Sequence, residues 1–553
     1  MDLYLIIVII MLALAVSGLV VGVANDAVNF LNSALGSKAA PRYVIMTVAS
    51  VGIIVGAITS NGMMEVARSG VFHPEMFTFA EVMLLFLAVM FTNVILLDIF
   101  NTLGMPTSTT VSLVFGLLGA AVGISIFKIA NDALVTLPDG SLATMADMIN
   151  TGNAMAIIGG ILISVVIAFV CGTVVMYITR LIFSFRYQSK LKSYGAVWCG
   201  IALTAISYFA VFKGLKGTQV IPADWMSWME GHIPMMLGGL LVGWSLIMSI
   251  LSMLKVNILR ITVLAGTFSL ALAFAGNDLV NFIGVFVAGV DAYDIVRTTG
   301  DTNMLMGGLN DPVVANLLIL FLSGAVMVVT LWFSKKAQSV SDTEINLARQ
   351  DVGVERFGST SASRAIVRAT INCNKNYEKY TPERIQRFIA SRFVPVANAK
   401  DKAPFDLIRA TVNLTVASLL ISMATSLQLP LSTTYVTFMV AMGSSLSDRA
   451  WGRESAVYRI TGVLTVIAGW FFTALVAFTV SFAVAVLLMW GGVFAVAGLS
   501  VLCCYLMIRS TKAHNRKLKR EAEKQAEHKA VTDESSIVDR SVREITEMMN
   551  KVT

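Results

Sequence analysis

Long apolar segments are the feature that most constrains how this chain can fold. Thirteen stretches have the length and composition of a bilayer-crossing helix, which needs about 20 mostly apolar residues. Hydrophobic residues make up 56% of the chain and charged residues only 14%, which leaves more apolar surface than a soluble protein buries. Because only helices and closed barrels satisfy their backbone in lipid, we expect an all-α polytopic membrane protein. The segments lie near residues 4–24, 43–62, 82–102, 107–127, 154–179, 195–213, 235–254, 261–288, 313–334, 406–428, 431–447, 458–480 and 482–507.

Two of these segments are candidates for partial crossings. Segments 107–127 and 431–447 are short, and a proline stands at the start of each, at Pro106 and Pro430. Proline suits the first turn of a helix, so each segment can begin inside the membrane rather than at its surface. We therefore expect about 12 transmembrane helices, with broken or re-entrant helices at the midplane.

Loop charges predict the orientation of the chain. Loop 180–193 has four basic residues and no acidic one, whereas loops 128–153 and 289–312 carry mainly aspartate. Since basic loops stay in the cytoplasm, the N-terminus is expected outside and the C-terminus inside. The net charge of +7 follows from these loops and the tail, so no nucleic-acid partner is expected.

Charge also divides the chain into regions. We expect a first transmembrane repeat with its connecting helices at 1–254, and a second repeat in two parts at 255–334 and 406–508. Between those parts lies a large polar region, 335–405, which is expected to be a cytoplasmic loop. The charged residues 509–553 are expected to form a cytoplasmic tail.

Two helix starts are predicted within the large loop. Ser341 and Glu344 have the spacing of a capping box, and Thr381 with Pro382 suggests an N-cap followed by a first helical position. The second helix has an apolar face that could lie on the membrane surface. A partly ordered linker is an equal alternative for this region, and a signalling module is a third.

An internal duplication organises the apolar part of the chain. The pattern N-D-x-V-N-F occurs at Asn25–Phe30 and again at Asn277–Phe282, each time at the end of an apolar segment. The pattern P-x-S-T-T occurs in "MPTSTTV" and again, in the same order, in "LPLSTTY". The copies begin in the first and the eighth segment, so an odd number of crossings separates them and they point in opposite directions. The sequence therefore predicts two inverted repeats with one site at their interface.

The Asn-Asp strings have the chemistry of a cation site. A carboxylate in a membrane segment is costly and marks a functional site by default. Asp26 and Asp278 have no Lys or Arg nearby in their own segments, so a bound cation or a proton is the simplest partner. Hard cations such as sodium prefer the oxygen ligands that Asp and Asn supply. The alternative is a pair of polar residues that lock helices together through hydrogen bonds.

The Ser-Thr-Thr strings have the chemistry of an anion site. Their hydroxyls fall in the first turn of a helix, beside unpaired backbone N–H groups and the positive end of the helix dipole. The alternative is ordinary helix capping, since Ser and Thr are common caps. The candidate residues are Ser108, Thr109, Thr110, Ser432, Thr433 and Thr434.

Cation ligands beside an anion cradle favour an importer over a channel. A dianion that enters a cell against 100 mV costs about 4.6 kcal/mol, at ~2.3 kcal/mol per charge. Two monovalent cations carried with it cancel that cost, and a third drives the anion inward.

At these motifs the sequence resembles the inorganic phosphate transporter (PiT) family of sodium- or proton-coupled phosphate permeases. The family carries a duplicated G-A-N-D-V-A-N, which stands here as "VANDAVN" and "AGNDLVN", and a duplicated P-x-S-T-T-H. The chain departs from the pattern where the leading Gly is replaced by Val23 and Ala275, and where the His is replaced by Val111 and Tyr435. The resemblance covers most of the chain except the C-terminal tail.

The resemblance implies a role for each matching residue. The coupling cation would be bound by Asn25, Asp26, Asn277 and Asp278. Phosphate would be bound by the six Ser and Thr residues of the two turns. Asn29, Asn281 and Asp98 are further candidates for the site, and Asn101 also precedes the first turn.

The expected function is import of inorganic phosphate coupled to sodium. A proton-coupled phosphate permease and a sulfate permease on the same scaffold remain alternatives. No enzyme activity, no cofactor and no metal other than sodium are expected, because the four His residues fall outside the apolar segments. The expected partners are phosphate, sodium or a proton, the lipid bilayer and a second copy of the chain in a homodimer. The expected location is the bacterial cytoplasmic membrane.

Overall fold

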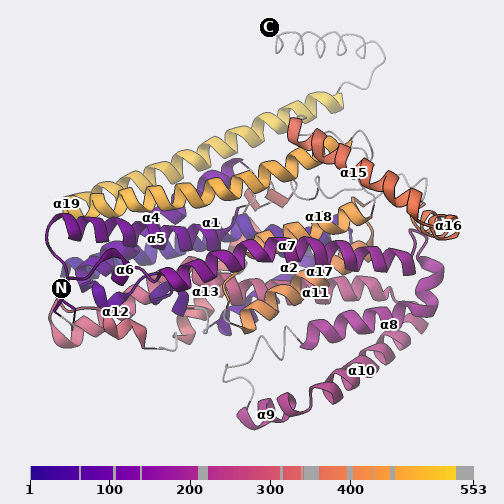
Figure 1. Ribbon diagram of the computed structural model, residues 1–553, viewed down its shortest axis with the longest axis horizontal. Coiled ribbons are helices and arrows are strands. Elements are labelled where there is room, and N and C mark those ends of the chain that lie inside the picture. Colours follow the sequence, from indigo (N-terminus) through magenta and orange to yellow (C-terminus); the bar gives the residue numbers. More distant parts are fainter. Residues whose placement is uncertain are drawn as a thin grey trace, which may run out of the picture. The chain divides into compact units, whose positions relative to one another are not determined.

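The computed structural model is built of helices that run mostly along one direction (Figure 1). It forms two compact units, Met1–Ser500 and Val501–Thr553. The residues that the structure describes are 2–60, 64–103, 107–137, 140–208, 222–311, 316–334, 336–337, 340–341, 345, 360–394, 403–427, 429–448 and 455–530.

The long helices account for most of the described chain. They are α1 (Asp2–Gly36), α2 (Arg42–Ile58), α4 (Phe79–Leu103), α5 (Thr109–Ala130), α7 (Thr151–Ile182), α8 (Gln188–Ile206), α10 (Ile233–Met253), α11 (Ile258–Leu279), α12 (Val285–Thr299), α13 (Leu317–Phe333), α15 (Ser361–Tyr380), α16 (Glu383–Arg392), α17 (Leu407–Ser426), α18 (Thr433–Ser447) and α19 (Ser455–Ala530). The shorter elements are α3 (Glu65–Arg68), η2 (Pro74–Met76), α6 (Met145–Met148), α9 (Ala223–Gly231), a π-helical turn η4 (Val280–Gly284) and η5 (Gly307–Asn310).

The all-α membrane fold is confirmed, whereas the number of crossings is not. Every one of the thirteen apolar segments overlaps a described helix. Among the described residues, eight helical stretches are long and apolar enough to cross a membrane, and α2 and α13 are shorter apolar helices. The structure thus supports a polytopic protein but does not establish about 12 crossings.

Several predicted helix boundaries are wrong, and three of them bear on the site, on α19 and on the large loop. The first helix does not end at residue 24, because α1 continues to Gly36 and carries the first Asn-Asp string inside it. The last two segments are not separated near residue 481, because the break in α19 is at Gly492, where φ is 50° and ψ is −131°. The helix in the large loop begins at Glu383, one residue later than predicted. Pro382 is its N-cap because its ψ of 138° is extended.

Other predictions for the large loop stay untested. Glu344, the partner in the predicted capping box, lies outside the described residues. Outside the large loop, the same is true of Pro106, which precedes the first Ser-Thr-Thr turn. Ile385 and Phe388 on α16 are about half exposed, which leaves their apolar face free for a membrane surface.

Two helix pairs approach each other closely through glycine. On α2, a Cβ at Gly56 would lie 2.3 Å from the carbonyl oxygen of Leu272 on α11. On α18, a Cβ at Gly443 would lie 2.4 Å from the carbonyl oxygen of Phe169 on α7. Small residues allow such backbone contact between membrane helices, where no difference in hydrophobicity drives them together.

A buried ionic cluster holds the C-terminal end of α18. Arg180 on α7 donates to Asp448 from Nε at 2.5 Å and from Nη2 at 2.8 Å, and to Asp406 from Nη1 at 2.9 Å. Arg409 Nε lies 3.2 Å from Asp448. The cluster therefore fixes α7, α17 and α18 at one end.

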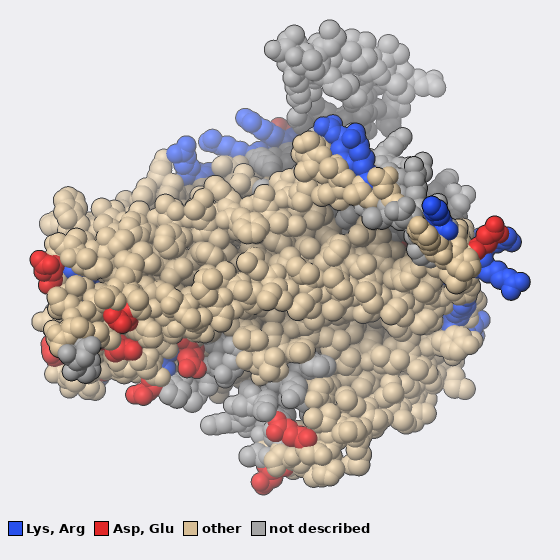
Figure 2. Space-filling view, viewed as in Figure 1, with Lys and Arg blue, Asp and Glu red and all other residues tan. Residues whose placement is uncertain are grey.

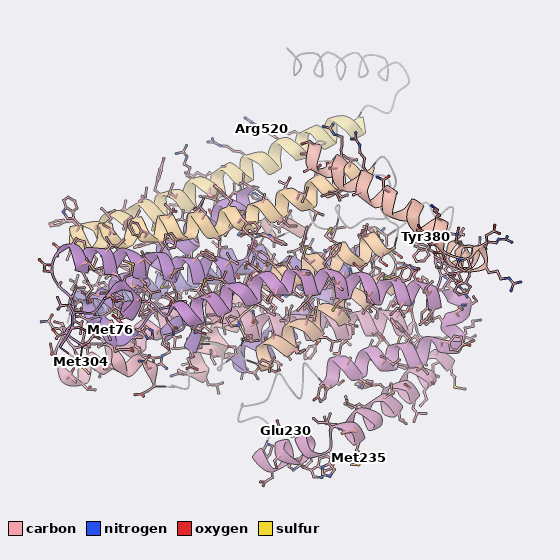
Figure 3. All side chains as sticks on the ribbon, in the orientation of Figure 1. Met76, Glu230, Met235, Met304, Tyr380 and Arg520 are labelled. Carbon is pink, nitrogen blue, oxygen red and sulfur yellow. The ribbon has the colours of Figure 1, made fainter. Side chains whose placement is uncertain are left out.

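A second buried ion pair connects α4 and α5 in a similar way. Lys128 near the end of α5 donates to Glu81, in the first turn of α4, at 2.8 Å and to the carbonyl oxygen of Met76 at 2.9 Å. Close by, Phe79 N donates to Met304 O at 3.0 Å, and Figure 3 shows Met76 and Met304 at the same end of the bundle. Buried charges of this kind persist only when paired, so these contacts fix where the helices end.

Surface charge differs between the two ends of the unit Met1–Ser500. Figure 2 shows acidic side chains at the left end and Lys and Arg side chains at the right end, around α16. This asymmetry is the one that basic cytoplasmic loops would produce. The orientation of the chain in a membrane remains a prediction.

We predict that Gly443→Ala destabilises the protein by about 1–3 kcal/mol, the usual cost of forcing a methyl group into a packed core. The measurement is the thermal unfolding midpoint in detergent. Gly159→Ala is the matched control, because Gly159 is on α7 and a Cβ there meets nothing within 4 Å. Equal midpoints for the two variants would contradict the close contact between α7 and α18.

Candidate functional site

Both Asn-Asp strings lie in the core of the bundle. Asp26 on α1 and Asp278 at the end of α11 are completely buried, and Asn25 and Asn277 beside them are buried too. Among the described residues, no ion pair joins either carboxylate to a basic side chain.

Both Ser-Thr-Thr strings form the N-termini of buried helices. Ser108 is the N-cap of α5 and accepts a hydrogen bond from Val111 N at 3.1 Å. Ser432 is the N-cap of α18 and accepts one from Tyr435 N at 3.2 Å. The two serines therefore cap their helices, as the structural alternative predicted, and the capping leaves the threonine hydroxyls for other partners.

The first carboxylate accepts hydrogen bonds from both turns. Thr109 on α5 donates to Asp26 Oδ2 at 2.9 Å. Thr434 on α18 donates to Asp26 Oδ1 at 3.1 Å. Each oxygen of this carboxylate is thus held by a different half of the chain.

The second carboxylate repeats the arrangement with the halves exchanged. Thr433 on α18 donates to Asp278 Oδ2, and Thr110 on α5 donates to Asp278 Oδ1 at 3.2 Å. Residues more than 300 positions apart therefore meet at one pair of carboxylates. The structure brings the two turns together, as the duplicated motifs predict.

Two further asparagines connect the halves in the same reciprocal way. Asn29 Nδ2 donates to Thr433 and Thr434, at 3.3 and 3.1 Å. Asn281 Nδ2 donates to Thr109 and Thr110, at 3.2 and 2.9 Å. Both residues were further candidates from the sequence, and both belong to this network.

Polar residues on α4 support the network. Asn101 accepts from Asn25 Nδ2 at 2.7 Å and donates to the carbonyl oxygen of Val21 at 2.7 Å. Asn93 donates to the carbonyl oxygen of Asn281 at 3.1 Å, in the π-helical turn η4. Sequence reasoning missed Asn93. The signal for it in the sequence was an amide in the middle of an apolar segment.

Asp98 has a different partner. Lys336, which follows α13, forms an ion pair with Asp98 Oδ1 at 2.6 Å. No hydrogen bond between the Asp98 side chain and the two buried carboxylates is observed within the described residues. The structure therefore places this candidate beside the site, where it ties α4 to the start of the large loop.

The asparagines of the two Asn-Asp strings differ in whether their side-chain oxygens accept hydrogen bonds. Asn25 Oδ1 accepts from Thr107 N at 3.0 Å, and Asn29 Oδ1 accepts from Thr437 at 3.2 Å. In contrast, the side-chain oxygens of Asn277 and Asn281 are buried and accept no hydrogen bond from the described chain. Buried acceptors are normally satisfied, so these two oxygens are available to ligate a cation.

The amide orientation at these positions is set by their surroundings. Asn277 Nδ2 donates to the carbonyl oxygen of Leu431 at 3.0 Å, which cannot donate, and to Asp278 at 3.1 Å. Asn281 Nδ2 donates to Asp278 Oδ1 at 2.7 Å. The nitrogen of each amide must face these acceptors, so the oxygens point away from them.

The site combines negative side chains with positive helix ends. α5 and α18 both begin at the network, and the N-terminus of a helix carries a partial positive charge and unpaired N–H groups. An anion is favoured there without any Lys or Arg. One compact region therefore offers carboxylate and amide oxygens to cations, and hydroxyl and N–H donors to an anion.

Comparison with known proteins decides the family. A model described as the phosphate transporter family matches residues 22–337, more than half of the chain, including both Asn-Asp strings and the first Ser-Thr-Thr turn. The chain belongs to the phosphate transporter family. With its apolar helices, a member of this family is an integral membrane protein.

Two individual proteins are similar to this family member. A protein of Thermococcus kodakarensis named as a phosphate permease is 25% identical over 200 residues, which are 36% of this chain and 45% of that protein. The match thus spans less than half of that curated relative. A solved structure described as the sodium-dependent phosphate transporter has a TM-score of 0.61 at 16% identity, and covers 87% of this chain and 98% of the other. This likeness shows a shared fold.

Proposed function

We propose that the protein imports inorganic phosphate by secondary active transport, coupled to sodium. The observation that carries the proposal is that the Ser-Thr-Thr turns of α5 and α18 hydrogen-bond the same two buried carboxylates. Membership of the phosphate transporter family favours phosphate over the sulfate alternative. A bacterial cytoplasmic membrane and a homodimer belong to the same proposal.

The cations are assigned to the Asn-Asp strings. Asp26 and Asp278 supply charge, and Asn25 and Asn277 supply neighbouring amide groups. Two carboxylates buried without a basic partner among the described residues need compensating positive charge, because a desolvated anion is costly. Sodium ligated by these oxygens would provide it, and the unused oxygen of Asn277 favours this position.

Phosphate is assigned to the two Ser-Thr-Thr turns. Six residues, Ser108, Thr109, Thr110, Ser432, Thr433 and Thr434, would surround it with hydroxyl and backbone N–H donors. A small anion that loses its water needs donors on several sides, and only both turns together can supply them. Reciprocal contacts between the two halves also support the inverted repeat that the sequence predicts.

Competition for the threonine hydroxyls would couple the two ligands. In the structure these hydroxyls donate to the carboxylates, so they are not free to donate to phosphate. A cation on a carboxylate withdraws the charge that attracts the hydroxyls, which can then rotate toward the anion. Cation binding would therefore precede phosphate binding and raise the affinity for phosphate. By linkage, bound phosphate would raise the affinity for the cation by the same factor.

We predict that a sodium gradient drives uptake of labelled phosphate into proteoliposomes, and that Asp26→Asn and Asp278→Asn each abolish it. Asparagine keeps the shape but removes the charge that pairs with the cation. Asp294→Asn, at an exposed position of α12, is the control for general effects of losing a carboxylate. Uptake that depends on a pH gradient and not on sodium would support the proton-coupled alternative instead. Normal sodium-driven rates in both site variants would contradict the assignment.

We predict that Thr109→Val and Thr433→Val each raise the apparent Michaelis constant for phosphate roughly tenfold or more. The reason is that a hydrogen bond to a charged group contributes about 1.5–3 kcal/mol. Their effect on the apparent sodium constant should be smaller. Thr267→Val is the matched control, because its buried hydroxyl donates only to Val263 O of its own helix, at 2.9 Å. If the apparent Michaelis constant for phosphate stays unchanged in both site variants, the assignment of phosphate to the two turns is contradicted.

We predict that sulfate competes poorly with phosphate. Hydrogen phosphate keeps a proton that it can donate to a carboxylate oxygen, whereas sulfate has none at neutral pH. The measurement is inhibition of labelled phosphate uptake by a large excess of sulfate, with unlabelled phosphate as the reference. Equal inhibition by the two anions would favour the sulfate permease.

A further inference from the structure

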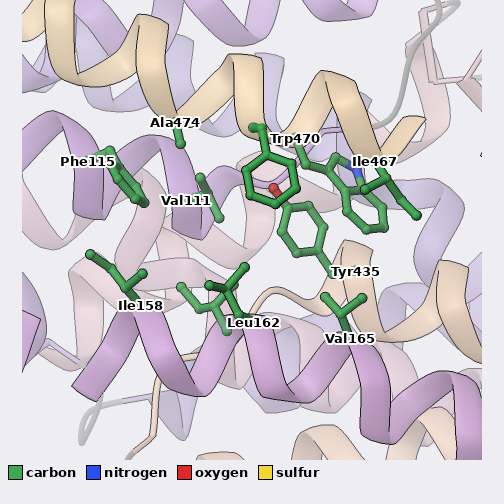
Figure 4. Close-up of a pocket in the computed structure, with 11 residues that line it drawn as sticks. Val111, Phe115, Ile158, Leu162, Val165, Tyr435, Ile467, Trp470 and Ala474 are labelled. Atoms are coloured by element: carbon green, nitrogen blue, oxygen red, sulfur yellow. The ribbon is translucent and has the colours of Figure 1, made fainter. Parts of the chain in front are cut away.

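An apolar cavity of about 330 Å³ lies between α5, α7, α18 and α19, in the unit Met1–Ser500 (Figure 4). Its walls come from the beginning of α5 and α18 and from the sides of α7 and α19. The lining residues include Val111, Phe115, Leu162, Val165, Tyr435 and Trp470. The function described above makes no use of this cavity.

Part of the cavity wall is formed by the two residues that follow the Ser-Thr-Thr turns. Val111 and Tyr435 directly follow those turns, and their backbone N–H groups are the ones that Ser108 and Ser432 cap. The ring of Tyr435 stacks on Trp470 of α19, with centroids 3.8 Å apart. Anything inside the cavity therefore touches the first turn of both helices.

The outer side of the cavity is continuous with the surface that a bilayer covers. Leu162 and Phe471 line the cavity and are also 47% and 62% exposed. Around them α7 and α19 present further exposed apolar side chains, among them Val166 at 63% and Leu475 at 64%. Both helices are apolar enough to cross a membrane, so hydrocarbon is the solvent of this surface.

We propose that this cavity is a binding site for an acyl chain of a bilayer lipid. Water is a poor occupant, because apolar cavities that offer few hydrogen-bond partners stay dry. An empty space of this size would forfeit the dispersion contacts that a close-packed interior normally has. A flexible hydrocarbon chain enters from the adjoining lipid without leaving an apolar medium, and it fills the space. The site takes hydrocarbon chains as a class and makes no selection by headgroup.

An acyl chain in the cavity would also account for the side chains at the two positions that follow the Ser-Thr-Thr turns. Val111 and Tyr435 present a methyl surface and a ring face to the cavity, where a charged or strongly polar group would contact hydrocarbon. A chain in the cavity packs against α5 and α18 at the turns that, under the proposed function, must adjust when phosphate binds. Occupancy by lipid does not depend on that function, so its test needs no transport measurement.

The test is photolabelling of the full-length protein in vesicles of phosphatidylethanolamine and phosphatidylglycerol. The vesicles contain a phospholipid with a diazirine midway along one acyl chain, and labelled residues are mapped by mass spectrometry. The variants are Val165→Phe, which fills the cavity, and Val166→Phe, which makes the same change at the neighbouring bilayer-facing position. Ala474→Leu is a second filling variant, in case the larger ring disturbs α7.

We expect label on two lining residues, the partly buried Phe115 and the buried Trp470, in the unmodified protein, in addition to label on exposed residues such as Leu475. The filling variants should lose the label on Phe115 and Trp470 and keep it on Leu475, and Val166→Phe should keep both. Label confined to exposed residues in the unmodified protein would overturn the proposal. Label on Phe115 and Trp470 that survives both filling variants would overturn it too, since the chain would then reach them by another route.

Discussion

Two carboxylates that are buried without a basic partner among the described residues constrain the rest of this structure. Neither Asp26 nor Asp278 forms an ion pair with a described Lys or Arg, and both are completely buried. Burial of such groups is tolerable only if donors and positive dipoles surround them. The threonines of two turns supply the donors, and the N-termini of α5 and α18 supply the dipoles. The convergence of four helices, α1, α11, α5 and α18, follows from this requirement.

Sharing each carboxylate between the two halves couples their positions. Asp26 accepts from Thr109 of one half and Thr434 of the other, so neither turn can shift without breaking a bond to the same side chain. Asp278 imposes the same condition with the halves exchanged. A ligand that replaces these bonds therefore changes the connection between the halves, and the buried ionic clusters of Asp448 and Glu81 keep the far ends of α18 and α5 fixed meanwhile. Under the proposed function, binding and rearrangement would be linked by the same few hydrogen bonds.

The sequence predicted what depends on composition and on repetition. Apolar length identified helices at every one of the thirteen segments, and the duplicated motifs identified the residues that meet in the core. Local reasoning failed where distant partners decide the outcome. α1 continues through Asn25 and Asp26 because Asn101, Thr109 and Thr434 satisfy their side chains, and nothing near residue 24 reveals those partners. The same holds for Asn93, whose acceptor is the carbonyl oxygen of Asn281, nearly 200 positions away. The break at Gly492 rather than near residue 481 depends on one backbone conformation that apolar composition does not encode.

The residues that follow the two turns limit how protons can take part. Val111 and Tyr435 stand where the resembling family carries His, and both face an apolar cavity rather than the carboxylates. The side chains that bond each other in the described network are Asp, Asn and Thr, and of these only Asp is an ionisable type. Apart from the protonation of phosphate itself, any effect of pH within this network must therefore act through Asp26 or Asp278. A proton and a sodium ion would then compete for the same oxygens, so the two coupling modes are alternatives at one site rather than separate functions of separate residues.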